Sequence, residues 1–192
     1  TPRYTTAPPT PPPPTTTYTT LWRANNTASY QTGAGTTEQY GSYPGAMRQG
    51  WAYGISAGPY YSCAAFTSTA ESGSHVGQTI STALSGATIK KVEIIFNVRD
   101  TYDGSSKNLL LGWGSGTSLT SGLSLAQTTY SGINVGSKTI VAPSALHTVI
   151  ASGGRVICLG PGANSTLANY LIVHGEGSST SYRPALKITY QK

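Results

Sequence analysis

Short runs of alternating apolar and polar residues recur along most of the chain, separated by clusters of glycine, serine and asparagine. The clearest run is residues 88–99, "TIKKVEIIFNVR". Its evenly spaced apolar side chains are Val92, Ile94, Phe96 and Val98. Because the side chains of a strand point alternately to its two faces, this spacing predicts a strand with one buried face and one mostly solvated face.

A turn and a returning strand are predicted directly after this run. Residues 101–107 contain Asp103 and Gly104, a pair suited to the positive φ of a tight turn. In the segment that follows, residues 108–114, the apolar face consists of Leu109, Leu111 and Trp113. The pattern therefore predicts two antiparallel neighbours in a sheet.

Seven further segments have the length and composition of strands. They are residues 46–55, 60–68, 123–131, 137–142, 155–160, 168–175 and 185–190. Residues 143–154 predict the one helix, with Pro143 at its first position and apolar residues at helical spacing before two glycines. We expect an all-β fold: a jelly-roll-like antiparallel sandwich of about eight to ten strands with one short helix.

The first 20 residues differ from the rest, because nine are threonine and seven are proline. Proline fixes its own φ and favours extended geometry in the residue before it, so the four prolines at 11–14 predict a polyproline II rod. We expect residues 1–20 to form an extended linker or arm and residues 21–192 to form the sandwich domain.

Charged residues are sparse, at 9% of the chain against about a quarter in a typical globular protein. The formal net charge is +6, but the basic residues are scattered and the only adjacent pair is Lys90 and Lys91. A stripe of bases that would neutralise phosphates is missing, so we expect no nucleic-acid partner. No apolar run approaches the roughly 18 residues of a membrane span, and we expect no membrane insertion.

The two cysteines, Cys63 and Cys158, each lie in an apolar segment predicted to be a strand. They either pair across two sheets or remain buried thiols, and the sequence leaves both possibilities open.

Candidate catalytic groups are few, because the chain has six acidic residues and three histidines. Asp100 and Asp103 are close in sequence, but both fall at the predicted turn, where acidic residues commonly stabilise the turn itself. They would hold calcium only with help from backbone carbonyls. The histidines lack the short spacings of a zinc site. We expect a protein that is not an enzyme and has no cofactor.

Aromatic residues with a polar tip are abundant, since the chain has thirteen tyrosines and three tryptophans but two phenylalanines. Such rings suit contacts at surfaces. The densest stretch is residues 40–61, and its candidate glycan-binding residues are Tyr43, Trp51, Tyr53, Tyr60 and Tyr61. The alternative is that the same rings fill a core or a subunit interface.

Several segments, taken in order, resemble the C-terminal domains of minor tail or tail-fibre proteins from phages of actinobacteria. They are "MRQGWAYG", "GQTISTALSGATIKKVEIIFNVR", "SGGRVICLG" after a small helix, and "SYRPALKITY". The chain is also distantly similar to secreted jelly-roll modules. The resemblance implies a virion component near the tail tip, assembled with other virion subunits, frequently trimeric, that contacts the glycan-rich host envelope.

Three functions follow as alternatives. The first is a stalk-displayed phage tail domain that attaches to host cell-surface glycan. The second is a structural virion protein, in the head or the tail, whose arm and aromatic residues bind neighbouring subunits. The third is a carbohydrate-binding module of a secreted hydrolase. The first two predict a virion location and the third predicts secretion.

Overall fold

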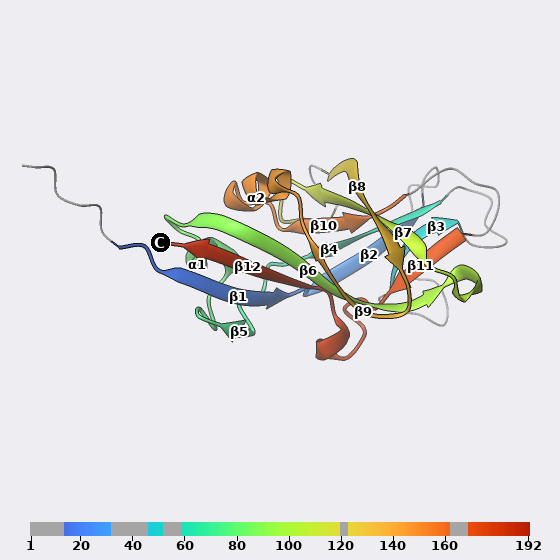
Figure 1. Ribbon diagram of the computed structural model, residues 1–192, viewed down its shortest axis with the longest axis horizontal. Helices are drawn as coiled ribbons and strands as arrows, with labels where there is room; N and C mark the ends of the chain where they lie inside the picture. The colour runs from blue at the N-terminus through green and yellow to red at the C-terminus, as the bar shows by residue number, and fades with distance from the viewer. Residues whose placement is uncertain (1–13, 32–45, 52–58, 120–122, 162–168) are drawn as a thin grey trace, which may run out of the picture.

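The computed structural model describes residues 14–31, 46–51, 59–119, 123–161 and 169–192. These residues form an antiparallel β-sandwich with two short helices, so the predicted all-β fold is confirmed (Figure 1). The described residues contain twelve strands, more than the eight to ten expected. Neither helix in this part of the chain is long and apolar enough to cross a membrane.

One layer is built around the longest strand, β6. Its strands are β1 (Thr17–Arg23), β3 (Met47–Trp51), β5 (Ser72–Gly73), β6 (Thr88–Thr101), β9 (Gly136–Val141), β11 (Asn169–Val173) and β12 (Ala185–Gln191). They pair in the order β5-β1-β12-β6-β11-β3, and β9 pairs with β6 as well. The pairing of β1 with β12 brings the beginning and the end of the sandwich together.

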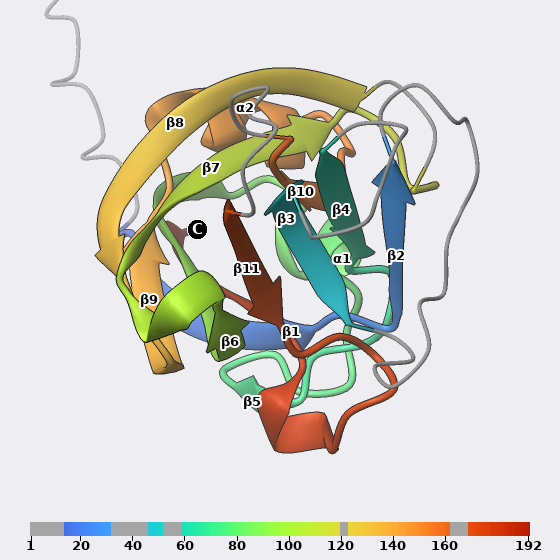
Figure 2. The ribbon, with the colours of Figure 1, turned by 90° about the vertical axis from the view of Figure 1, so that its right-hand side faces the viewer.

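The second layer has the order β2-β4-β10-β7-β8. Its strands are β2 (Asn26–Gln31), β4 (Tyr60–Ala65), β7 (Lys107–Gly114), β8 (Leu123–Ile133) and β10 (Val156–Leu159). The layers are joined through β3 and β4, which share one pair of facing residues, Gly50 and Tyr60. Seen end-on, the two layers surround a common interior (Figure 2).

The interior is filled as the alternation in the sequence predicted. Val92, Ile94, Phe96 and Val98 are at most 2% exposed. They pack in one cluster with Leu109 and Leu111 of β7 and with the other buried apolar side chains of both layers. The turn between β6 and β7 also forms as predicted, since Asp103 and Gly104 have φ of 58° and 71°.

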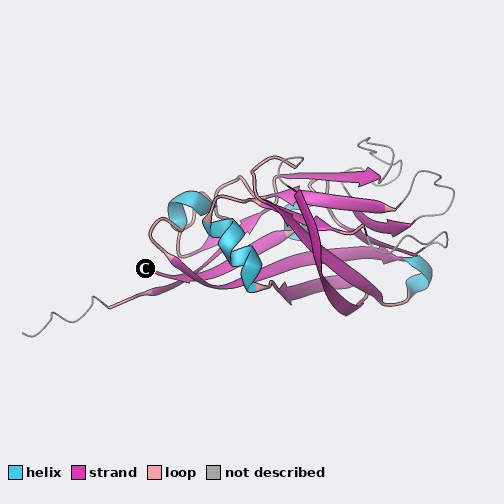
Figure 3. Ribbon diagram, turned by 90° about the horizontal axis from the view of Figure 1, so that it is seen from above, coloured by secondary structure: helices cyan, strands magenta, loops and turns pink. Residues whose placement is uncertain are grey.

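Helix α2 (Ser144–Ala151) lies across one side of the sandwich (Figure 3). Pro143, predicted as its first residue, is its N-cap, and the helix buries Leu146 and Ile150. Helix α1 (Ile80–Ala83), a single turn capped by the Thr79 side chain, was not predicted from the sequence. Two 3₁₀ turns, η1 (Tyr102–Gly104) and η2 (Thr180–Tyr182), complete the elements of the described residues.

The first strand begins four residues before the predicted start of the sandwich domain at residue 21. Strand β1 begins at Thr17, and the Thr16 amide donates to the Lys192 carbonyl at 2.8 Å. The β-branched threonines that close the arm suit an extended strand as well as a linker, so composition did not mark the boundary. Residues 1–13, including most of the predicted polyproline rod, lie outside the described residues.

A cluster of three aromatic side chains holds the start of β1 against the end of β12. The Tyr18 ring stacks on Tyr190 with centroids 5.7 Å apart, and His75 meets Tyr18 edge-on at 4.8 Å. Tyr190 is fully buried, and its hydroxyl hydrogen-bonds to His75 Nδ1 and, at 3.2 Å, to Thr20 Oγ1. These contacts hold the first strand to the last one.

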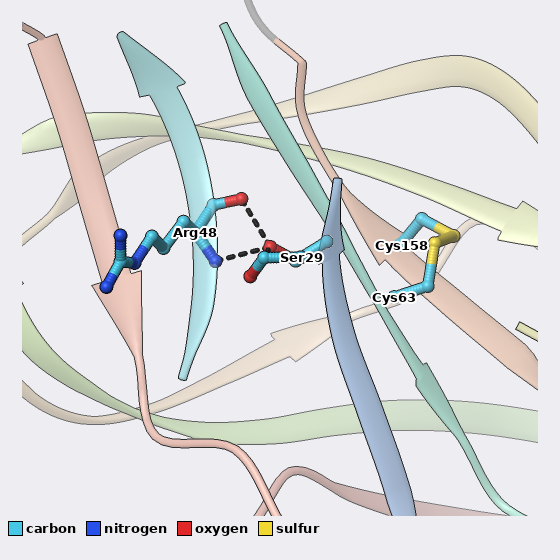
Figure 4. The surroundings of a disulfide bond; sticks show 5 residues. Ser29, Arg48, Cys63 and Cys158 are labelled. Atoms are coloured by element: carbon cyan, nitrogen blue, oxygen red, sulfur yellow. Dashed lines mark hydrogen bonds between the residues drawn. A yellow bond between two sulfur atoms is a disulfide. The ribbon is translucent and has the colours of Figure 1, made fainter. Parts of the chain in front are cut away.

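Cys63 and Cys158 form a disulfide between neighbouring strands β4 and β10 (Figure 4). Pairing across two sheets was one of the two expectations, but the bond lies within one layer. It belongs to a second apolar cluster on the face of that layer turned away from the core. Besides the cysteines, the buried members of this outer cluster are Ala65, Leu119 and Val156.

The disulfide joins residues 95 positions apart, so it restricts the unfolded chain strongly. We expect the Cys63→Ala/Cys158→Ala variant to lose about 2–5 kcal/mol of unfolding free energy. Urea unfolding with and without reductant measures this loss, and reductant should leave the variant unchanged. Equal midpoints for oxidised and reduced wild-type protein would show that the bond adds no stability.

Candidate functional site

A pocket of about 450 Å³ lies where β3, β7 and β11 approach one another, at the end of the sandwich opposite its termini. We call this end the distal end. The pocket is lined by Gln49, Gly50, Trp51, Ser106, Lys107, Asn108, Leu110, Thr129, Asn169, Tyr170 and Leu171. In Figure 1, η1, β11 and β3 mark this end, and β1 begins at the other, near the C-terminus.

Strand β3 reaches the pocket along the junction of the two layers, where its backbone has almost no pairing with β4. Side chains replace the missing ladder (Figure 4). The Arg48 N–H donates to Ser62 Oγ, and the Ser62 hydroxyl donates to the Arg48 carbonyl. Just before β3, Ser29 Oγ donates to the Ala46 carbonyl at 2.8 Å. Buried backbone groups at this junction are thereby satisfied by side chains, although β3 and β4 have almost no backbone pairing.

Gln49 makes a second side-chain connection from β3 to the second layer, in this case to strand β7. Its Nε2 donates to the Asn108 carbonyl at 2.7 Å, and its Oε1 accepts from the Leu110 N–H at 2.8 Å. The amide thus pairs with β7 as a strand would, beyond the point where β10 ends. Gln49 is 6% exposed, and it was not among the residues predicted to form a site. In the sequence, the only indication of this role was a Gln within a segment predicted to be a strand.

Gly50 allows β3 and β11 to meet beside the pocket. Its φ is +91°, a conformation that favours glycine. A Cβ at this position would lie 2.1 Å from the Asn169 carbonyl oxygen. The glycine therefore permits a close approach of two backbones next to Trp51.

The charged side of the pocket is a compact ion pair on the turn between β6 and β7. Lys107 Nζ lies 3.0 Å from Asp103 Oδ1, donates to Ser105 Oγ at 2.7 Å, and stands 5.5 Å from the centre of the Tyr102 ring. Hydrogen bonds from Ser105 and the Lys107 ammonium lower the pKa of Asp103 to about 2. The carboxylate is therefore ionised at every physiological pH.

The predicted alternative of a calcium site at Asp100 and Asp103 is not supported by these contacts. The Asp103 carboxylate already accepts hydrogen bonds within the turn and pairs with the Lys107 ammonium. Asp100 Oδ2 accepts a 3.4 Å hydrogen bond from the Tyr170 hydroxyl. No group of three or more His, Cys, Asp or Glu side chains in the described residues could hold a metal ion. Turn formation, the other interpretation of these acids, is what the geometry shows for Asp103.

The predicted glycan-binding residues separate in space. Trp51 lines the pocket. Tyr60 is 1% exposed, so its inclusion was wrong, because a buried ring cannot stack on a sugar. Tyr61 lies against the outer cluster and stacks on Tyr30, with centroids 4.9 Å apart. Tyr43 and Tyr53 lie outside the described residues.

Two pocket residues come from a segment that was predicted only as a strand. Tyr170 and Asn169 stand at the start of β11, directly opposite Gly50 and Trp51 of β3. The Tyr170 ring also meets Tyr102 edge-on at 5.7 Å. Because β11 and β3 are far apart in the chain, their meeting depends on the topology and gave no local signal.

No protein-family model matches the chain, and neither a curated protein nor a solved structure matches it.

Gly50→Ala should destabilise the protein more than a matched glycine substitution. Gly77 also has positive φ, at +82°, but a Cβ added there would have nothing within 4 Å. Both variants carry the left-handed strain of about 1–2 kcal/mol, and Gly50→Ala adds a clash that costs about 1–3 kcal/mol more. Denaturant unfolding compares the two, and equal losses would contradict the close approach of β3 and β11.

The Asp103 carboxyl should titrate near pH 2 in the folded protein. Since its folded pKa is depressed, its contribution to stability is complete above its unfolded pKa of about 3.9 and is lost as the pH falls towards 2. Ser105→Ala and Lys107→Met should each raise this pKa, because the hydrogen bond from the Ser105 hydroxyl and that from the Lys107 ammonium are its two largest causes. Carboxyl NMR titration measures it, and a midpoint near the ordinary value of about 3.9 in the wild type would contradict the turn geometry.

Proposed function

We propose that this protein is a non-enzymatic attachment domain of a phage tail, which binds host cell-surface carbohydrate through the distal pocket. The observation that carries the proposal is the placement of the pocket. The chain enters the sandwich through β1 at one end, and the pocket opens at the other. A domain held by an N-terminal arm would therefore present the pocket outwards.

The lining of the pocket suits a sugar. Trp51 and Tyr170 supply aromatic surface, on which the apolar face of a sugar ring packs well. Around them are amide and hydroxyl groups, which match the hydroxyls of a saccharide as donors and acceptors. The volume of about 450 Å³ is within the range of small-molecule sites.

Low affinity at each pocket is compatible with this function. A virion carries repeated copies of its tail proteins, and linked sites bind far more tightly than single ones because the later binding events become intramolecular. A homotrimer, which the resemblance implies, would provide three pockets facing the same surface. The same pocket would serve a carbohydrate-binding module of a secreted hydrolase.

A structural role in the virion is the second candidate, and the edge of the sandwich favours it. Val135 and Val141 are each 54% exposed, beside and within strand β9. Strand β9 pairs only with β6 among the described strands, and on its other edge the Val141 carbonyl accepts a hydrogen bond from the Tyr130 hydroxyl. Exposed apolar side chains next to an edge that no described strand pairs with suit a contact between subunits.

Trp51→Ala should abolish saturable binding of the full chain to host cells and to their envelope glycans. The substitution removes the largest aromatic side chain of the pocket lining. Tyr182→Ala is the matched control, since this aromatic residue is 48% exposed and does not line the pocket. Flow cytometry of labelled protein measures the cell binding, and thermal unfolding verifies that both variants fold.

Two outcomes would overturn the proposal. If folded wild-type protein binds neither cells nor extracted glycans, even after artificial trimerisation, the structural role becomes the better explanation. If Trp51→Ala and Tyr182→Ala bind equally well, the attachment site lies elsewhere on the molecule.

A further inference from the structure

We infer that the distal pocket selects a neutral, hydroxyl-rich saccharide and discriminates against acidic sugars such as uronates. This inference rests on the proposed function and adds the class of ligand. It depends on which polar groups line the pocket and which of them are already engaged.

The first observation is the near absence of charge in the lining. Among the lining residues that the structure describes, Lys107 is the only one that carries a charge at neutral pH. The polar remainder consists of the amides Gln49, Asn108 and Asn169 and the hydroxyls Ser106, Thr129 and Tyr170. Amides and hydroxyls pair with sugar hydroxyls, whereas an ionised carboxylate needs a cationic partner when it is desolvated.

The second observation is that the Lys107 charge is already neutralised. Its ammonium is held by Asp103 at 3.0 Å and by Ser105 at 2.7 Å, and the side chain is only 13% exposed. A sugar carboxylate would have to compete with Asp103 for this cation. It would also bring a second negative charge next to the Asp103 carboxylate, which disfavours binding.

The third observation identifies the groups left for the ligand. The Gln49 amide uses both of its polar atoms on the β7 backbone, so it shapes the pocket and has little left for a sugar. By contrast, Asn108 and Asn169 make no side-chain hydrogen bond to any described residue, and neither do Ser106 and Thr129. These uncharged groups come from three strands and a turn and line the same pocket as Trp51.

The test compares two oligosaccharides of equal length and linkage, one with glucose and one with glucuronate at the terminal position. Isothermal titration calorimetry of the full chain is run at about 0.05 M and about 0.5 M NaCl, concentrations that differ several-fold in screening length. We expect the neutral ligand to bind at least about tenfold more tightly, with less than about a twofold change between the two salt concentrations.

A variant tests the role assigned to the ion pair. Asp103 does not line the pocket, and Asp103→Asn removes the carboxylate that holds Lys107. We expect this variant to gain affinity for the glucuronate ligand relative to the glucose ligand by about three- to tenfold. The gain should shrink at high salt, because it depends on an unpaired ammonium.

The outcomes separate this inference from the proposed function. Preference for the neutral ligand, together with the gain of Asp103→Asn, supports both. Equal affinity, or a salt-sensitive preference for glucuronate, overturns the selectivity and leaves carbohydrate attachment standing. Binding of neither ligand, nor of any member of a wider array of neutral and acidic glycans, overturns the proposed function itself.

Discussion

The junction between the two layers of the sandwich depends on how strand β3 satisfies its backbone. This strand pairs fully with β11, but it shares only the Gly50–Tyr60 pair with β4. A buried N–H or C=O without a partner costs on the order of 1–3 kcal/mol, so a strand in this position needs substitutes. Ser62 provides them for the Arg48 backbone of β3. The Gln49 side chain does the same for the Asn108 carbonyl and the Leu110 N–H of β7. Trp51 is the last residue of the same strand, so its position in the pocket depends on this junction.

Much of the fold could be predicted from local patterns, because alternation reports which face of a strand is buried. The strand around Val92 and Phe96 was predicted for this reason, the turn was predicted from the Asp103–Gly104 pair, and helix α2 was predicted from its helical spacing of apolar residues. Strand β2 was missed, since "NTASYQ" has few large apolar residues. Strand β1 was assigned partly to the arm, because threonine suits both.

The pocket could be predicted only in part, since its residues come from strands far apart in the chain. Trp51 was identified from the density of aromatic residues around it, and Tyr60 was included for the same reason although it is buried. Aromatic density does not report which way a ring points. The role of Gln49 depends on where β10 ends, and that of Asn169 on the approach allowed by Gly50. Both are properties of the assembled sheets.

The pairing of β1 with β12 has a mechanical consequence for a tethered domain. Strand β1 runs from the entry of the chain towards the distal end, and all of its residues, Thr17–Arg23, pair with β12. A load applied between the arm and the pocket would pull β1 along its own axis, across hydrogen bonds that lie perpendicular to it. These bonds would resist together in shear and would not open one after another as in a zipper.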